Sequence, residues 1–223
     1  MIRRVGLVGV LVVCLLALSL SVAGARRALV LLMPRGAMGV EFFAMLAVFE
    51  KAGVSVDVAA PQAGPYLFWE DTAEGVAWGA VGGYEWTIGM TYDDVVLEGY
   101  DILILGPGHA HTWWYGKPQE QLESLFRAAV ARGMPVAAIS SGIQHLIELG
   151  LVKNRKVAQP PYVFGVQDPD IHVAMMNEYP VDYQKRRCVY VDLGGPGQYA
   201  LITGGYACPD GFAEAIVQFL RNH

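Results

Sequence analysis

The residue best placed for chemistry is Ser140, in the stretch AAISSGIQHL, residues 137–146. An apolar strand pattern precedes this serine and a helical pattern follows it, so it occupies a sharp strand-to-helix turn. Such a turn presents its residue outward, beside backbone N–H groups that favour anions and oxyanions. The motif lacks the first glycine of a G-x-S-x-G elbow, because Ala138 stands there. Ser140 is therefore a candidate nucleophile, and the alternative is an ordinary helix N-cap.

Two histidines could act as the base that a serine hydroxyl needs in order to react. His109 and His111 lie in the segment GPGHAHTWWYG, directly after the apolar run DILIL. A solvent-facing loop position is the alternative for each. Two histidines and one carboxylate also permit a metal site, but this pattern is too weak to predict one. We predict neither a metal nor a cofactor.

Glu41 is the acid expected near this serine, in the first turn of a helix predicted over residues 40–53. Burial would raise the pKa of its carboxyl group, whereas the positive end of its own helix would lower that pKa. The sequence does not decide which effect is larger. The alternative is a simple first-turn acid that the helix dipole favours.

Three aromatic residues and a further histidine have less specific interpretations. Trp113, Trp114 and Tyr115 are adjacent in the chain. We expect them at a subunit interface, where large aromatic side chains dominate contacts, with the floor of a ligand site as the alternative. His145 lies five residues beyond Ser140 in the next helix, and we expect it to be a packing or surface residue.

Strand and helix patterns alternate along the chain and must position these residues. Strands are predicted at 28–33, 54–61, 101–105 and 135–139, a hairpin at 188–203, and helices at 40–53, 118–133, 141–150 and 210–222. The first helix is expected to be apolar at Val40, Phe43, Ala44 and Ala47. Residues 62–99 are expected to be irregular or hairpin structure.

The alternating order of strands and helices predicts an α/β fold, a doubly wound and mostly parallel sheet with helices on both faces. Ligands bind such sheets at the carboxyl ends of the strands, so the loops after Met33, Leu105 and Ile139 are the ones expected to form a site.

Length and charge restrict the domain count and the partners. The chain has 223 residues, of which 54% are hydrophobic, a size that suits one domain with one substantial core. Its formal net charge of -5 and the absence of a basic stripe argue against nucleic acid as a partner.

The N-terminus resembles an export signal. Arg3 and Arg4 precede an apolar run over residues 5–24, and the run ends in the small-residue pattern AGA at 23–25. We predict cleavage after Ala25, which makes 1–25 the signal and 26–223 a single domain outside the cytoplasm, secreted or at the cell surface. The alternative is an uncleaved membrane anchor formed by residues 5–24, which is long enough to span a bilayer.

Cys188 and Cys208 would remain after cleavage, an even pair that could form a disulfide in an oxidising compartment. The predicted hairpin places Cys188 opposite Gly204, so the loop after Gly204 would have to fold back for a bridge to form. Two buried free thiols are the alternative.

Several of these stretches together resemble the ThiJ/PfpI (DJ-1) superfamily, whose fold is similar to that of class I glutamine amidotransferases. AAISSGIQHL resembles the nucleophile elbow A-A-I-C-x-G of that family, and YDILILGPGHA resembles its Y-D-x-x-x-x-P-G-G segment. The first strand and helix, the segment LVKNRKVA and the C-terminal strand and helix also resemble family segments, in the correct order.

The resemblance implies a flavodoxin-like sandwich that is commonly dimeric or higher. It places the family's cysteine nucleophile at Ser140, its pocket glutamate at Glu41 and its oxyanion-loop glycine at Gly108. Ser141 stands where the peptidase branch has a histidine, and the P-G-G turn has become Gly106, Pro107 and Gly108.

Two functions follow from this resemblance. The first is a domain outside the cytoplasm that keeps the family pocket for a small molecule or a peptide but lacks the cysteine chemistry. The alternative is a serine-dependent hydrolase of the peptidase or amidase type, with Ser140 as nucleophile and His109 or His111 as base. The expected partners are the pocket ligand and further copies of the chain, with membrane contact only through an uncleaved N-terminal segment.

Overall fold

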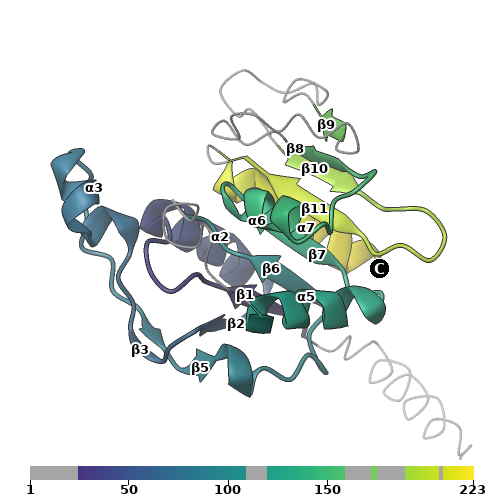
Figure 1. The fold of residues 1–223 in the computed structure, drawn as a ribbon, viewed down its shortest axis with the longest axis horizontal. Helices are drawn as coiled ribbons and strands as arrows, with labels where there is room; N and C mark the ends of the chain where they lie inside the picture. The colour runs from purple at the N-terminus through teal and green to yellow at the C-terminus, as the bar shows by residue number, and fades with distance from the viewer. Residues whose placement is uncertain (1–24, 109–119, 159–171, 175–188, 206–207) are drawn as a thin grey trace, which may run out of the picture.

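The computed structural model describes residues 25–108, 120–158, 172–174, 189–205 and 208–223 (Figure 1). Of the predicted features, the segment 1–24 and Cys188 lie outside these ranges, as do His109, His111 and the aromatic residues at 113–115. Within the described ranges, no helix is both long enough and apolar enough to cross a membrane.

The described residues form a central seven-stranded sheet, with strand order β10-β11-β7-β6-β1-β2-β5. Its strands are β1 (Arg27–Leu31), β2 (Ser55–Ala60), β5 (Met90–Thr91), β6 (Ile102–Leu105), β7 (Val136–Ile139), β10 (Val189–Asp192) and β11 (Leu201–Gly204). All neighbours pair in parallel except β10 and β11, which form the predicted antiparallel hairpin. Its register differs by one residue from the predicted one, because Val189, and not Cys188, lies opposite Gly204. The predicted α/β fold with a mostly parallel sheet is confirmed.

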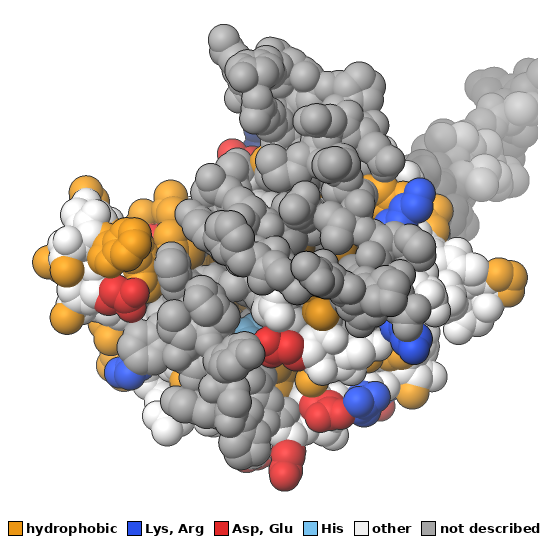
Figure 2. Space-filling view, turned by 45° about the horizontal axis from the view of Figure 1, so that its top comes forward, with side chains coloured by type: hydrophobic (Ala, Val, Ile, Leu, Met, Phe, Trp, Pro, Cys, Tyr) orange, Lys and Arg blue, Asp and Glu red, His pale blue; other side chains and the backbone are white. Residues whose placement is uncertain are grey.

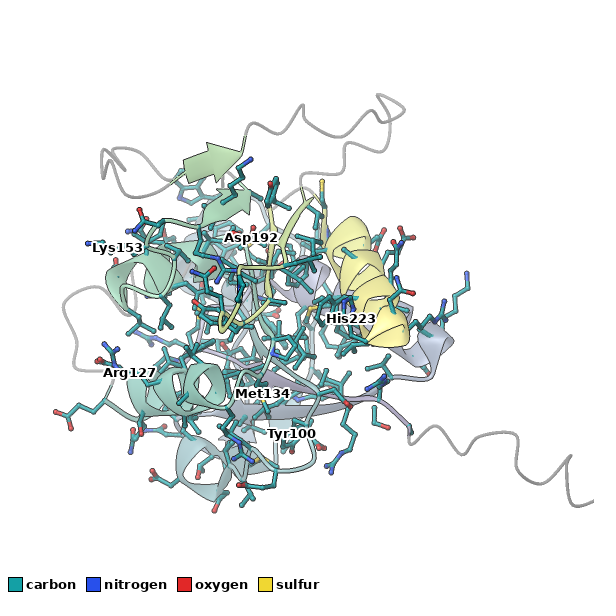
Figure 3. All side chains as sticks on the ribbon, turned by 90° about the vertical axis from the view of Figure 1, so that its right-hand side faces the viewer. Tyr100, Arg127, Met134, Lys153, Asp192 and His223 are labelled. Carbon is teal, nitrogen blue, oxygen red and sulfur yellow. The ribbon has the colours of Figure 1, made fainter. Side chains whose placement is uncertain are left out.

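Helices cover both faces of this sheet (Figures 1 and 3). On one face α2 (Gly39–Ala52) packs against α7 (Pro209–Asn222), and on the other lie α5 (Glu120–Ala131) and α6 (Gly142–Glu148). Figure 3 shows α7, with His223 at its end, on the opposite side of the sheet from α5, which carries Arg127. Because side chains alternate along a strand, Ala28 and Val30 of β1 join one core, and Leu29 and Leu31 join the other.

The buried face of α2 differs from the one that the sequence pattern indicated. Val40 is exposed, and the side chains that face the core are Phe42, Met45 and Phe49, together with Glu41. The helix carries apolar residues around most of its circumference, so its periodicity could not identify the buried side. Gly53, in a left-handed conformation, ends the helix as predicted.

The segment between β2 and β6 holds several short elements. These are β3 (Gly64–Pro65), η1 (Trp69–Asp71), α3 (Ala73–Ala77), β4 (Thr87–Ile88), β5 and η2 (Tyr92–Asp94). β3 and β4 pair as a small antiparallel ribbon, and β5 extends the main sheet, which the sequence pattern did not show. In Figure 1, α3 projects from the body of the molecule. Val76 of α3 is exposed, and so are Trp78 and Val81, which follow this helix in the chain. Figure 2 shows hydrophobic side chains at the same end of the molecule.

A buried arginine joins the hairpin to β8 (Lys156–Ala158), which pairs in parallel with β9 (His172–Ala174). Arg155 is only 4% exposed, and it donates hydrogen bonds to the Asp192 carboxylate at 2.9 Å and to the Tyr199 carbonyl at 2.9 Å. Asp192, labelled in Figure 3, is the last residue of β10. Burial alone would raise the pKa of Asp192, but the hydrogen bond and charge of Arg155 and the N–H groups of Lys156 and Gly194 hold this pKa below its usual value.

Cys208 immediately precedes α7 and is disulfide-bonded. The two other cysteines of the chain, Cys14 and Cys188, lie outside the described residues. Pairing with Cys188 therefore stays a prediction, whereas a free thiol at Cys208 is excluded.

Candidate functional site

Ser140 adopts a strained backbone conformation at the end of β7. Its φ angle is +58°, a left-handed value that non-glycine residues rarely adopt and that costs about 1–2 kcal/mol. Its N–H donates to the carbonyl of Gly204 in β11 at 2.8 Å, which fixes the turn to the neighbouring strand. The N-cap of α6 is Ser141 and not Ser140, so the N-cap interpretation of Ser140 is wrong. A strained residue at a strand end needs another explanation.

The loop after β6 packs directly against this turn. A Cβ atom on Gly142, the first residue of α6, would lie 3.1 Å from the carbonyl oxygens of Leu105 and Gly106. One on Gly108 would lie 2.5 Å from the Met33 side chain and 3.1 Å from Ala37, in the loop between β1 and α2. The loops after three parallel strands therefore meet at the carboxyl edge of the sheet.

Glu41 reaches the same point from the first turn of α2. Its side chain is 4% exposed and is hydrogen-bonded to the side chain of Ser140, which is itself only 6% exposed. The second carboxyl oxygen of Glu41, Oε2, is buried and has no hydrogen-bond partner among the described residues. A buried polar atom of this kind is costly unless a ligand, a water molecule or another group satisfies it.

The pKa of Glu41 is raised to about 8. Loss of water around the carboxyl group is the largest cause, and the negative charge of Glu70 adds to it. The hydrogen bond from Ser140 acts in the opposite direction but is weaker than these two effects. Burial is thus the main effect on the pKa of Glu41, and with a pKa of about 8 the carboxyl group is mostly protonated at neutral pH.

Glu70 is the site residue that the sequence analysis missed. It belongs to η1, is 4% exposed, and accepts hydrogen bonds from the N–H groups of Gly39 at 2.8 Å and of Val40 at 3.0 Å. These are the first two residues of α2, whose N-cap residue, Met38, makes no side-chain cap. A carboxylate at this end of a helix is favoured both by the free N–H groups and by the helix dipole. Glu70 thus provides the negative charge at the start of α2 that was the alternative interpretation of Glu41.

Two tyrosines fix the loop that leads from β1 to α2. The hydroxyl of Tyr92 donates to the carbonyl of Leu32 at 2.6 Å, and that of Tyr66 donates to the carbonyl of Met33 at 3.0 Å. Tyr66 also accepts from the N–H of Ala37 at 3.2 Å. Burial raises the pKa of both phenols, so they remain neutral donors. The segment of residues 66–92 thus supports the loop that leads into the first turn of α2, where Glu41 lies.

The remaining candidates are distributed as follows. His145 is buried, and its Nδ1 lies 3.1 Å from a carboxylate oxygen of Glu148, in agreement with a packing role. His109 and His111 fall outside the described residues, so the structure does not place a histidine relative to Ser140. The described parts of the chain contain no group of three or more metal-binding side chains.

Comparison with known proteins gives matches in sequence and in structure. The profile of the DJ-1/PfpI family matches residues 26–189. A deglycase of Pyrococcus horikoshii is 32% identical over 93 residues, which are 42% of this chain and 53% of the deglycase. The match thus spans about half the length of that curated relative.

Solved structures of the same family share the fold. DJ-1beta of Drosophila melanogaster superposes with a TM-score of 0.64 at 21% identity, covering 88% of this chain and 90% of the other. An oxidized DJ-1 of Toxoplasma gondii gives 0.65 at 17% identity, covering 89% and 92%. At such identities the likeness concerns the fold alone.

Proposed function

The chain belongs to the DJ-1/PfpI family, and from this premise we propose that it uses the family pocket to bind a small molecule or peptide without cysteine chemistry. The observation that carries the proposal is the buried pair of Ser140 and Glu41, in which the pKa of Glu41 is raised to about 8. The titratable side chain hydrogen-bonded to Ser140 holds its proton at neutral pH, so it cannot accept the hydroxyl proton of an attacking serine. The same pair can bind a ligand.

Ser140 occupies, in this proposal, the position of the cysteine of the family motif. The resemblance of AAISSGIQHL to A-A-I-C-x-G supports this assignment, and so does the left-handed turn at Ser140. A thiol can be converted to a thiolate by its surroundings, whereas a serine hydroxyl ionises far less readily and needs a positioned base. The substitution therefore removes the nucleophile and keeps the geometry of the pocket.

The ligand group is expected to be a carbonyl or carboxylate oxygen. Ser140 and protonated Glu41 each carry one O–H hydrogen, and one of the two is used in the hydrogen bond between them. The other remains for an acceptor, and the buried Oε2 of Glu41 is a position from which it can be donated. Gly108 and Ser141, at the edge of the same turn and loops, are expected to line the pocket.

Binding of a small carbonyl probe tests this function. We expect pyruvate to bind at pH 6.5 and to be released as the pH rises through about 8, because ionised Glu41 repels an acceptor. Calorimetric titration of the wild type, Glu41→Gln and Ser140→Ala measures this. Glu41→Gln should remove the pH dependence near pH 8, and Ser140→Ala should weaken binding. Pyruvate affinity that is independent of pH between 6.5 and 9.5 in the wild type would contradict the proposal.

A serine-dependent hydrolase is the second candidate, and the strain at Ser140 favours it. Ser140 has a left-handed conformation, and strained non-glycine residues cluster at catalytic sites, where the surrounding structure holds them in place. In this alternative Ser140 attacks the substrate carbonyl while His109 or His111 takes its proton, and the same histidine then protonates the leaving group as its bond to the carbonyl breaks. Water hydrolyses the acyl group from Ser140, and Glu41 contacts the substrate.

Labelling distinguishes the two candidates. A hydrolase would form a covalent adduct on Ser140 with a serine-directed phosphonate and would lose turnover in Ser140→Ala. Binding without such an adduct supports the first candidate. If an adduct forms, His109→Ala and His111→Ala identify the base as the variant that abolishes turnover.

The proposal also places the protein outside the cytoplasm, secreted or at the cell surface. The export-signal pattern of residues 1–25 supports this location, as does the disulfide at Cys208, because such bonds persist in oxidising compartments. Mass spectrometry of the native protein should find Arg26 as the first residue. An intact Met1 in a membrane fraction would instead support an anchor formed by residues 5–24.

Assembly into a dimer or higher oligomer is part of the same proposal. Exposed hydrophobic side chains at Val76, Trp78 and Val81 support a protein contact near α3. Sedimentation at micromolar concentration measures the oligomeric state, and a monomer at all concentrations would contradict this part of the proposal.

A further inference from the structure

We propose that Glu70 is a positioning residue of the pocket: its carboxylate caps α2 from a distant segment and so fixes the carboxyl group of Glu41 against the Ser140 hydroxyl. This inference rests on the proposed function, because it assigns a role to a residue behind the same pair. No motif in the sequence marks Glu70, which stands in the irregular stretch PYLFWEDTAEG.

The geometry of the cap carries the first part of the argument. Both oxygens of the Glu70 carboxylate are used, one on the N–H of Gly39 and the other on that of Val40. Glu41 is the next residue, so the cap fixes the backbone to which its side chain is attached. The ring of Tyr84 occupies the space where a side chain on Gly39 would lie, which closes this end of the helix.

Glu70 itself is held in place from several directions. The N–H of Trp69, the residue before it, donates to the carbonyl of Ala37 at 2.9 Å. The carboxylate of Asp71, the residue after it, accepts from the N–H of Gly83 at 2.6 Å. η1 is therefore anchored both to the loop before α2 and to the segment that returns from α3. A rigid support of this kind is what keeps the groups of a binding site in a fixed geometry.

The charge of Glu70 gives the cap a second effect. A negative charge near a buried carboxyl group disfavours its ionisation, and Glu70 raises the pKa of Glu41 in this way. Within the described ranges, the groups that act on the charge of Glu41 are Glu70 from η1 and the Ser140 hydroxyl from the turn after β7. The neutral phenol of Tyr66, which follows β3, is hydrogen-bonded to Met33 and Ala37 of the loop before α2. Glu70 thus both places the Glu41 carboxyl group and helps to keep it protonated.

The test is the titration of Glu41 itself, which needs no ligand. The midpoint is measured from the side-chain carboxyl ¹³C shift in the full-length protein, for the wild type, Glu70→Gln and Glu74→Gln. The wild-type midpoint is expected at about 8. Glu70→Gln should lower it by about one pH unit. Glu74→Gln is the matched control, because Glu74 is an exposed acid in the neighbouring α3, and its removal should leave the midpoint unchanged.

The outcomes separate this inference from the proposed function. A wild-type midpoint near the ordinary value of a glutamate would overturn the proposed function. A raised wild-type midpoint that Glu70→Gln does not move would overturn only the role of Glu70. A merely structural cap would change stability without moving the midpoint.

Two further variants cover a failure of Glu70→Gln to fold and an effect of Glu70 that does not act through Glu41. If Glu70→Gln does not fold, Glu70→Asp replaces it, because it keeps the charge but withdraws it by one methylene group. It should lower the midpoint by less, and an unchanged midpoint would again overturn the inference. In a Glu41→Gln background, Glu70→Gln should leave the pH profile of pyruvate binding unaltered, since no carboxyl group remains at position 41 to respond. If Glu70→Gln still changes the pH profile of pyruvate binding in the Glu41→Gln background, this would also contradict the role assigned to Glu70.

Discussion

The side chains of Glu41 and Ser140 are hydrogen-bonded inside the protein, although one follows strand β1 and the other follows strand β7. Neither strand is next to the other, because β6 lies between them in the sheet. The contact is formed only when the loops after all three strands fold over the carboxyl edge of the sheet. It is thus a sensitive indicator of the native arrangement of these loops.

The stability of the protein should fall as the pH rises from about 5 to about 8 because of Glu41. The folded-state pKa of this group, about 8, lies above its ordinary value of 4.5. Between these values the folded chain holds a proton that the unfolded chain has released, so each pH unit costs up to about 1.4 kcal/mol. Urea unfolding of wild type and Glu41→Gln over this range measures the effect. The free energy of unfolding of Glu41→Gln should increase relative to that of the wild type as the pH rises. The same pH dependence in both proteins would refute the raised pKa of Glu41.

Ser140→Gly should be more stable than Ser140→Ala by about 1 kcal/mol. Both variants lose the hydroxyl, but only glycine adopts φ of +58° without steric cost. Chemical denaturation gives the difference. Ala128→Gly, on the exposed side of α5, is the control and should show the opposite sign, with a loss of about 1 kcal/mol. Equal stability of the two Ser140 variants would mean that the turn relaxes without strain.

Gly75→Ala should destabilise the protein by about 1–3 kcal/mol and weaken pyruvate binding. An added Cβ atom would overlap the carbonyl oxygen of Trp69, so η1 would have to move and Glu70 with it. Thermal unfolding and calorimetry measure the two effects. Gly195→Ala is the control, because a Cβ atom there meets only the Gln198 side chain at 3.7 Å. An equal loss of pyruvate affinity in Gly75→Ala and Gly195→Ala would show that the effect does not arise from a displacement of η1.

Ser140→Cys should introduce a reactive thiol. Protonated Glu41 can donate a hydrogen bond to the thiolate and lower the pKa of the new thiol, which would make it sensitive to peroxide and to alkylating reagents. Mass spectrometry after a short iodoacetamide pulse at pH 7 detects the adduct. Combining the change with Glu41→Leu, which removes the donor, should slow alkylation at least tenfold. Equal rates in the two variants would exclude a role for Glu41.

The sheet and the meeting of three loops at its carboxyl edge were predictable because both depend on local patterns. Apolar runs such as DILIL mark buried parallel strands, and the ends of parallel strands lie at one edge. The role of Glu70 was not predictable, because an irregular segment carries no period that could place it beside α2. The buried face of α2 was mispredicted for a related reason: Val40 is as apolar as the residues that face the core.

The tyrosine and glutamate contacts of residues 66–92 with the β1–α2 loop have a consequence for local unfolding. The amides of Ala37, Gly39 and Val40 are bonded to side chains that lie about thirty positions further along the chain. They can exchange with solvent deuterium only when that segment lifts away or the helix end frays. If the segment opens as one cooperative unit, these three amides will share one opening free energy. The pocket would then be lost and regained in a single step, well before the sheet itself unfolds.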